Sequence, residues 1–385
     1  MDKYLYWLDC IEGLGAGTKK NLLEAFGSGE AIYHASEKML KYILEVKKLG
    51  LFMEARKHVL PEQAYEELLQ NNIKFCNCFE EEFPEKLKVI PDVPFMIYYK
   101  GKLPKQDIPS VAIIGARECS SYGEFVAGEL GDLLGGQGIQ VISGMARGID
   151  GISQMKAIEA GGVSYAVLGC GVDVCYPKGN KKLYEELLVK GGILSTYPPG
   201  TSPQARLFPA RNRIVSGLAD VLVVIEARRR SGTSITVDMA LEQGKDIYAL
   251  PGRVTDRLSD GCNKMIKDGA HVLLSPEDFL LDLQSLLPTK MKQLALETSM
   301  ILSQKEKKCS GEECENTGED KTDSVVKYIL EIMDFYPQSI ENIRTALRER
   351  FQLEIKQEEL VSQMMYLCIT GMVRQESQGW YSKVL

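Results

Sequence analysis

Short apolar runs alternate with helical segments from about residue 75 to residue 285, and this alternation restricts the possible folds more than any other feature. Each run is rich in β-branched or aliphatic residues and apolar on both faces, as in strands buried within a parallel sheet. The alternation predicts an α/β fold with a Rossmann-like, doubly wound and mostly parallel sheet. The predicted strands are Val111–Gly115, Ile139–Ser143, Val163–Gly169, Gly192–Ser195, Val221–Glu226, Ile247–Leu250 and His271–Leu274. The predicted helices are Tyr122–Leu134, Gly151–Glu159, Lys181–Val189, Ile235–Gln243 and Asn263–Lys267.

The chain has 385 residues, too many for one ordinary core, so we expect several domains. Residues 1–70 are predicted to be helical, and residues 71–289 contain the predicted sheet. Residues 290–322 are predicted to be a polar linker, because the stretch 303–321 carries four basic and six acidic residues. Residues 323–385 form a small, separate unit with helical periodicity.

The composition is that of a soluble globular protein, with 44% hydrophobic and 26% charged residues. The N-terminal segment lacks a signal-peptide cleavage pattern. Apolar runs such as Val221–Ile225 are far shorter than the ~20 residues of a membrane-spanning helix. We therefore expect a cytoplasmic protein without a membrane partner.

Ten cysteines and three histidines do not form a recognisable metal-binding pattern. The closely spaced pairs Cys76/Cys78, Cys170/Cys175 and Cys309/Cys314 lack the spacing of a zinc finger. Free thiols in a reducing cytoplasm are the expected state. We expect neither a metal nor a cofactor.

Positive charge is concentrated in one stretch, although the whole chain has a net charge of −7. Between Thr201 and Gly232 there are six arginines against two acidic residues. Arginine suits planar, bidentate contact with phosphate groups. The overall charge therefore does not exclude a phosphate-containing partner.

Ligands of such sheets bind at the carboxyl ends of the strands. Four loops that leave predicted strands there, or that lead into predicted helices, combine basic residues, glycines and hydroxyls. Gly115 and Arg117 follow the first strand, where a tight turn with a solvated arginine is the alternative. In the second loop we expect Arg147 to contact a ligand and Asp150 to cap the next helix. Together the four loops supply the candidate contacts Gly115, Arg117, Ser143, Gly144, Arg147, Gly148, Lys178, Asn180, Ser231, Gly232 and Thr233.

Alternatives remain open for several of these residues. Asn180 could cap the following helix, and the run Arg228–Arg230 before Ser231 could be a solvated loop. The segment Phe208–Gly217 adds Arg211, Asn212 and Arg213. On a helix the two arginines would point to different faces, whereas from an extended or entering segment both can reach the same ligand strand. Tyr176 and Phe208 could stack on bases or belong to the core.

Six motifs in this order resemble the DNA-processing protein A (DprA/Smf) family. They are Gly115–Arg117, SGMARGID at Ser143–Asp150, LGCGVDVCYPKGN at Leu168–Asn180, FPARNRIVSG at Phe208–Gly217, SGTSIT at Ser231–Thr236, and Pro251–Gly252 followed by SDGCN at Ser259–Asn263. The resemblance covers about residues 80–275. Two departures are Gln154, where the family often has histidine, and Thr196, where it often has glutamate.

The resemblance implies a non-catalytic protein that binds single-stranded DNA, protects it during natural transformation or recombination, and loads a RecA-type recombinase. It also implies a homodimer formed through the Rossmann-like domain. Carried over by position, the contacts would come from Arg117, Arg147, Lys178, Arg211 and Arg213, with Gly115, Gly144 and the Ser231–Thr233 segment shaping the pocket.

The flanking regions resemble DNA-binding modules less sharply. Residues 11–27 look like a helix-hairpin-helix, with Gly15, Lys19 and Lys20 as possible secondary DNA contacts and a purely structural helical domain as the alternative. The C-terminal region resembles a winged helix, with predicted helices Val325–Met333, Ile340–Arg348 and Gln357–Thr370 and a wing around Gly379. Its third helix offers Gln357, Glu358, Glu359, Ser362 and Gln363 and no basic residue, so we expect it to bind protein, or nothing, rather than duplex DNA.

An enzyme is the main alternative. Phosphoribohydrolases of the lysine-decarboxylase-like (LOG) group share the topology and carry a Pro-Gly-Gly-x-Gly-Thr-x-x-Glu loop. The counterpart here, Arg230–Thr236, ends in threonine rather than glutamate. The loops contain no other recognisable catalytic set.

Overall fold

The structure is a computed structural model that describes residues 2–296, 321–335, 337–355, 360–361, 363–364, 367–368, 372–377 and 379–384. The chain divides into two compact units, residues 1–118 with 127–296, and residues 119–126 with 297–385. Residues 288–296, at the start of the predicted linker, are helical, and residues 297–320 lie outside the described part. No described helix is long and apolar enough to cross a membrane.

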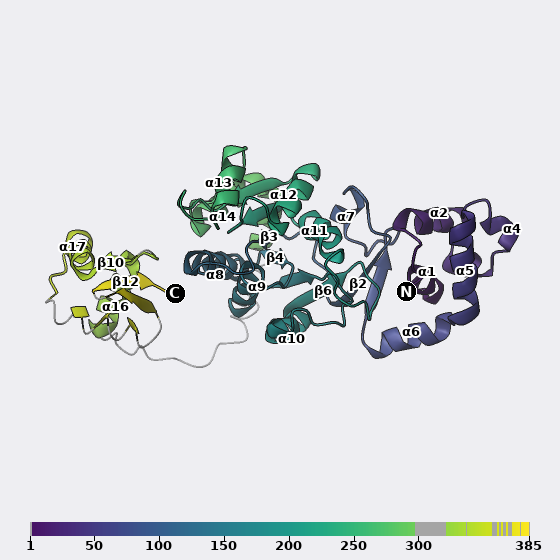
Figure 1. The fold of residues 1–385 in the computed structure, drawn as a ribbon, viewed down its shortest axis with the longest axis horizontal. Coiled ribbons are helices and arrows are strands. Elements are labelled where there is room, and N and C mark those ends of the chain that lie inside the picture. Colours follow the sequence, from purple (N-terminus) through teal and green to yellow (C-terminus); the bar gives the residue numbers. More distant parts are fainter. Residues whose placement is uncertain are drawn as a thin grey trace. The chain divides into compact units, whose positions relative to one another are not determined.

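Six helices precede the sheet and pack beside its β1–β2 edge (Figure 1). They are α1 (Lys3–Asp9), α2 (Ala16–Phe26), α3 (Gly29–His34), α4 (Glu37–Leu40), α5 (Val46–His58) and α6 (Pro61–Gln70). Asp2 begins α1 by accepting hydrogen bonds from the amides of Tyr4 and Leu5, which satisfies two donors of the first turn. Tyr98, from the sheet, donates a 2.6 Å hydrogen bond to Asp9 of α1. These helices therefore share a core with the sheet.

A nine-stranded sheet in the order β1-β2-β6-β5-β4-β3-β7-β8-β9 forms the centre of the larger unit. Its strands are β1 (Lys74–Asn77), β2 (Met96–Gly101), β3 (Ser110–Ile114), β4 (Gln140–Ser143), β5 (Ser164–Val167), β6 (Gly191–Ser195), β7 (Val221–Val224), β8 (Asp246–Ala249) and β9 (His271–Val272). The strands from β3 to β9 are parallel, whereas β1 and β2 are antiparallel and were not predicted. The mostly parallel α/β sheet is thus confirmed.

Burial explains why the sequence pattern revealed these strands. Every residue of β3, β4, β5, β6 and β7 is buried, which requires apolar or small side chains on both faces. The short edge strand β9 is exposed. The helices between and beyond the strands are α7 (Glu85–Lys88), α8 (Ser121–Gly136), α9 (Ile149–Glu159), η1 (Lys178–Asn180), α10 (Lys181–Lys190), α11 (Leu207–Leu218), α12 (Gly232–Glu242), α13 (Asp260–Lys267) and α14 (Pro276–Leu286).

Of the two conformations considered for Phe208–Gly217, the structure has the helix, because the segment lies within α11. Leu207, Ile214 and Leu218 fall on one side of the helix, at intervals of seven and four residues. Ile214 and Leu218 are buried in the core beneath the sheet. The segment therefore forms a helix, because its apolar residues recur at helical spacing and are buried against the sheet.

The smaller unit contains α16 (Lys321–Ile332), α17 (Ile340–Phe351) and an antiparallel sheet in the order β10-β12-β11. The strands are β10 (Gln338–Ser339), β11 (Val373–Ser377) and β12 (Trp380–Lys383). Ile329, Leu347 and Tyr381 belong to its apolar core. Of the residues singled out on the predicted third helix, Gln357, Glu358, Glu359 and Ser362 lie outside the described part.

Candidate nucleic-acid interface

A cleft of about 690 Å³ opens where the strand order of the sheet reverses, between β3 and β7. Such a reversal separates the loops that leave neighbouring strands and creates a crevice at their carboxyl ends. The predicted site residues that line the cleft are Gly115, Arg117, Gly144, Arg211, Asn212, Ser231, Gly232 and Thr233. The predicted residues outside its lining are Ser143, Arg147, Gly148, Lys178, Asn180 and Arg213.

The loops after β3 and β4 are held together by close backbone contacts. Gly148 has a φ of +71°, and a Cβ atom there would lie 2.3 Å from the carbonyl oxygen of Ala116. The amide of Ile149 donates to that same oxygen at 3.2 Å. Gly115 in turn packs on Ile149, which would stand 2.7 Å from an added Cβ. Glycine at 115 and 148 therefore fixes the shape of one wall of the cleft.

Two predicted contacts hold the β4 loop in place. The Ser143 hydroxyl is buried and donates to the Ile113 carbonyl oxygen at 2.6 Å, which joins the ends of β3 and β4. The Asn180 side-chain amide donates to the carbonyl oxygens of Met145 and Ala146, both at 3.0 Å. Asn180 makes no side-chain cap to α10. The side chains of Ser143 and Asn180 thus hold the loop in place through hydrogen bonds to backbone carbonyl oxygens.

Arg211 is the buried basic group of the cleft, with 5% of its surface exposed. Its Nη1 donates to the Val167 carbonyl oxygen at 2.7 Å. Its guanidinium lies against Gly144, where an added Cβ atom would stand only 1.9 Å from Nη1. Burial lowers the pKa of Arg211, and the carboxylate of Asp150 partly offsets this. Only a glycine at 144 leaves room for this guanidinium.

Asp150 does not cap the helix as predicted. It lies in the first turn of α9, with Gly148 at the cap position, and its Oδ2 accepts a 3.1 Å hydrogen bond from the amide of Gly144. Burial raises the pKa of Asp150, and the positive charge of Arg211 opposes the rise. The two buried groups therefore compensate each other electrostatically.

Two buried polar atoms of lining residues have no hydrogen-bond partner, the Nε of Arg211 and the hydroxyl of Ser231. Buried polar groups in folded proteins are nearly always paired, because an unpaired one costs about 1–3 kcal/mol. Both atoms are enclosed by the protein, so a ligand in the cleft would reach them only after neighbouring side chains move.

One side of the cleft is aromatic. The rings of Tyr176 and Phe208 lie 5.7 Å apart at 39°, and Tyr176 is 39% exposed. The guanidinium groups of Arg117 and Arg211 lie 5.7 and 5.8 Å from the Phe208 ring centroid. Both aromatic residues line the cleft, so they are accessible to a stacking ligand.

The other predicted basic residues have different surroundings. Arg147 is exposed on the loop after β4, and Lys178 is exposed at the start of η1. Arg213 points away from Arg211 on α11 and pairs with Asp92 at 3.6 Å. Because the segment is helical, Arg211 lines the cleft and Arg213 lies outside its lining, and a DNA contact of Arg213 stays a prediction.

The predicted secondary contacts lie at the start of α2. Lys19 is buried and pairs with Asp9 at 2.8 Å. The ammonium group of Lys20 donates to the Val93 carbonyl oxygen at 2.8 Å. Gly15 precedes the first residue of α2. Both lysines thus have structural partners within the protein.

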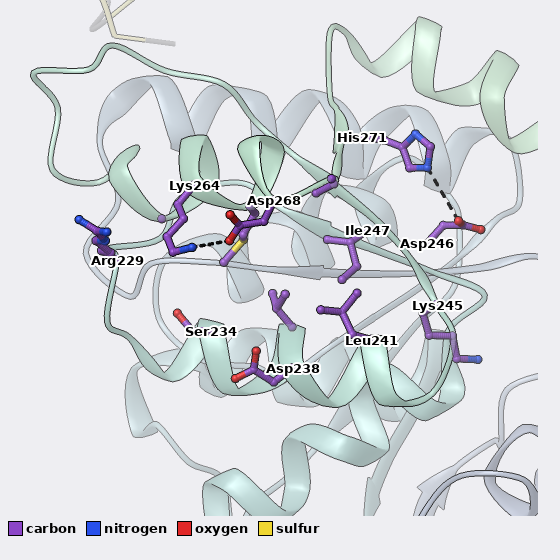
Figure 2. A pocket seen from close by; sticks show the side chains of 15 residues that line it. Arg229, Ser234, Asp238, Leu241, Lys245, Asp246, Ile247, Lys264, Asp268 and His271 are labelled. Carbon is purple, nitrogen blue, oxygen red and sulfur yellow. Dashed lines mark hydrogen bonds and ion pairs between the residues drawn. The ribbon is translucent and has the colours of Figure 1, made fainter.

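A second hollow of about 410 Å³ lies between α12 and α13 (Figure 2). Its apolar lining includes Leu241 and Ile247. Asp238, Asp246 and Asp268 bring three carboxylates to it, and Asp268 is paired with a neighbouring lysine. Arg229, Lys245 and Lys264 line this hollow as well, so its carboxylates and cations are equal in number, whereas the cleft has three arginines and two carboxylates. The arginine-lined cleft is the better candidate for a phosphate-containing ligand.

The fold and the cleft define an α/β protein with an arginine-lined crevice at the reversal of its strand order. The sequence model of the DNA recombination-mediator protein A family matches residues 74–284, more than half of the chain. The chain belongs to this family of recombination mediators.

Named relatives agree with this assignment. The chain is 41% identical over 207 residues to the DNA processing protein DprA of Streptococcus pneumoniae, covering 52% of this chain and 71% of the relative. It is 33% identical over 286 residues to the protein Smf of Synechocystis, covering 72% of each.

Two solved structures are similar as well. The S. pneumoniae DprA structure matches with a TM-score of 0.64 and 32% identity, covering 73% of this chain and 98% of the other. The structure of DNA processing protein A from Helicobacter pylori, described as showing a single-stranded-DNA binding mode, matches with a TM-score of 0.51 and 29% identity, covering 56% and 98%.

Proposed function

We propose that this chain binds single-stranded DNA in the cleft between β3 and β7 and acts as a non-catalytic recombination mediator. The carrying observation is the cleft itself, which is lined by Arg117, Arg211 and Arg228 together with the start of α12. A phosphate oxygen is an acceptor that fits this arrangement. The single-stranded-DNA binding described for the H. pylori relative supports the same ligand.

The geometry suits an unpaired strand. The exposed Arg117 and the buried Arg211 neutralise phosphates, and the amides at the start of α12 add the positive end of a helix dipole. Bases stack on Tyr176 and Phe208, which requires that they are not already stacked and paired in a duplex. Stacking is tolerant of base identity, so we expect little sequence preference.

Hydrolysis in the manner of the LOG group is the weaker alternative. Thr236 occupies the position of that group's glutamate, is buried, and donates to the Gly232 carbonyl oxygen within α12. The buried carboxylate of Asp150 is already engaged by the Gly144 amide and by the charge of Arg211. Neither group is placed as a general base for a ligand in the cleft.

Protein partners follow from family membership. We propose that the chain forms a homodimer through the sheet-containing domain and loads a RecA-type recombinase on bound DNA in the cytoplasm. We assign the C-terminal unit a winged-helix fold and the N-terminal helices a helix-hairpin-helix character. Light scattering tests the dimer, and stimulation of recombinase-catalysed strand exchange tests the loading.

Fluorescence anisotropy of a labelled dT oligomer, with a duplex of equal length as competitor, tests the DNA binding. We expect tight binding to the single strand that weakens with salt by about 0.7 log units of affinity per log unit of salt for each phosphate contact. Replacing Arg117→Ala, whose side chain is exposed, should cost about tenfold in affinity. Lys190→Ala should change little, because this residue lies at the amino ends of the parallel strands, just before β6, whereas the cleft lies at their carboxyl ends. Equal binding of both variants, or a preference for duplex, would refute the proposal.

A further inference from the structure

Beyond the cleft, four arginines surround a separate hollow of about 660 Å³. Its lining consists of Arg228, Arg229, Arg230 and Arg257 together with Asp260. The arginines come from the loop after β7 and from the loop after β8. Arg228 lines both this hollow and the cleft, so the two adjoin.

Backbone contacts hold the two loops beside each other. The amide of Ala227 donates to the Leu258 carbonyl oxygen, and the amide of Gly261 donates to the Ala227 carbonyl oxygen, both at 2.8 Å. A Cβ atom on Gly261 would lie 2.5 Å from the latter oxygen and 2.8 Å from that of Arg228. The sequence therefore uses glycine to bring the start of α13 against the arginine loop.

The charge of this hollow is not balanced within the described part of the chain. Four guanidinium groups face one carboxylate, and all four arginines are exposed. None of the four forms an ion pair with a described residue, in contrast to Arg213 with Asp92. Arg229 also reaches the end of the α12–α13 hollow that lies away from His271 (Figure 2). A cluster of one sign attracts a polyanion.

We infer that single-stranded DNA leaves the cleft over Arg228 and continues into this four-arginine hollow, which binds its next phosphates. The inference rests on the proposed function and assigns a direction to the bound strand, from β3 toward the loop after β8. Because both segments belong to one molecule of DNA, the second contact gains from the high effective concentration set by the first. A short oligomer fills the cleft alone, and a longer one fills both.

A length series of dT oligomers, from about 4 to about 16 nucleotides, separates the two sites. The test variant is Arg229→Ala/Arg257→Ala, which spares the residues of the cleft. The control is Lys102→Ala/Lys190→Ala, which removes two exposed positive charges where β6 begins, at the amino ends of the parallel strands. Circular dichroism melting verifies that both variants are folded.

We expect the test variant to bind the shortest oligomers as the wild type does and to lose about tenfold or more on the longest. Its salt slope on long oligomers should fall by about 1.4, the value for two phosphate contacts. An equal loss at every length would indicate a general field effect and overturn the inference, as would no loss at all. If the wild type binds no oligomer of any length, the proposed function itself fails.

Discussion

Arg211 is the side chain on which the cleft depends most. It is buried, its guanidinium occupies the space that a side chain at 144 would need, and its charge faces Asp150. A buried arginine is costly unless it is compensated, and here the compensation inside the protein is incomplete because Nε has no partner. A phosphate in the cleft, which Arg211 lines, would add negative charge near its guanidinium group.

Gly144→Ala should therefore remove the arginine from its position. The added methyl group would stand 1.9 Å from Nη1, so the hydrogen bond to Val167 must break or the loop must move. We expect a loss of about 1–3 kcal/mol in the free energy of unfolding, measured in urea, and a weaker affinity for dT oligomers. Gly136→Ala, in α8 and outside the cleft, is the matched control, because its Cβ would meet nothing within 4 Å. Equal stability of the two variants would contradict this role of Gly144.

The elements of the sheet were predictable because each buried strand is a short, continuously apolar run. The loops that combine glycine with arginine were visible in the sequence, and residues of the loops after β3, β4 and β7 line the cleft. The antiparallel strands β1 and β2 were not predicted, since β1 starts with an exposed lysine and their pairing is a long-range property. Helix α11 was not predicted, because the segment was interpreted from its arginines and not from the helical spacing of its apolar residues.

Within the site, the sequence could not distinguish a residue that contacts the ligand from one that supports it. Asn180 and Lys19 were predicted to contact phosphates. In the structure Asn180 donates to the carbonyl oxygen of Met145, 35 residues away in the sequence, and Lys19 donates to the carboxylate of Asp9, 10 residues away. Such partners become visible only when the chain is folded. The unpaired hydroxyl of Ser231 is likewise a property of the packed structure.

An ion-pair network joins the beginnings of β3 and β7 to two helical segments. Asp220 accepts from Lys86 of α7 at 2.9 Å, from Lys290 at 2.7 Å and from the amide of Ser110 at 2.9 Å. Burial alone would raise the pKa of Asp220, but the two lysines together bring it below its usual value. A carboxylate with a lowered pKa stabilises the fold above its unfolded pKa, near 4.

Asp220→Asn should cost about 3 kcal/mol in the free energy of unfolding at pH 7, because it leaves two partly buried lysines without their carboxylate. The stability that ionised Asp220 contributes is lost as the pH falls through its lowered pKa. The difference in free energy of unfolding between the two proteins should therefore shrink below about pH 4. Urea unfolding at pH 7 and pH 3 measures this. Glu85→Gln, which breaks the exposed pair with Lys88, should cost less than about 1 kcal/mol. A pH-independent difference would contradict the electrostatic origin.

The proposed DNA contacts lie in one of the two compact units. All residues lining the cleft belong to the larger unit, in the ranges 1–118 and 127–296. The four-arginine hollow lies in the same unit. The smaller unit builds its own core around Ile329 and Leu347. Single-strand binding should therefore not require the smaller unit.

A chain ending after residue 296 should bind dT oligomers within about twofold of the full chain, since it retains every arginine of the cleft and of the adjoining hollow. The full chain should also bind duplex DNA no better than the shortened one, because the predicted recognition helix offers no basic residue. Anisotropy titrations of both proteins on both ligands decide the matter. Loss of single-strand binding on shortening would show that the cleft is insufficient by itself. Loss of duplex binding alone would instead assign the C-terminal unit a DNA contact of its own, carried by basic residues outside that helix.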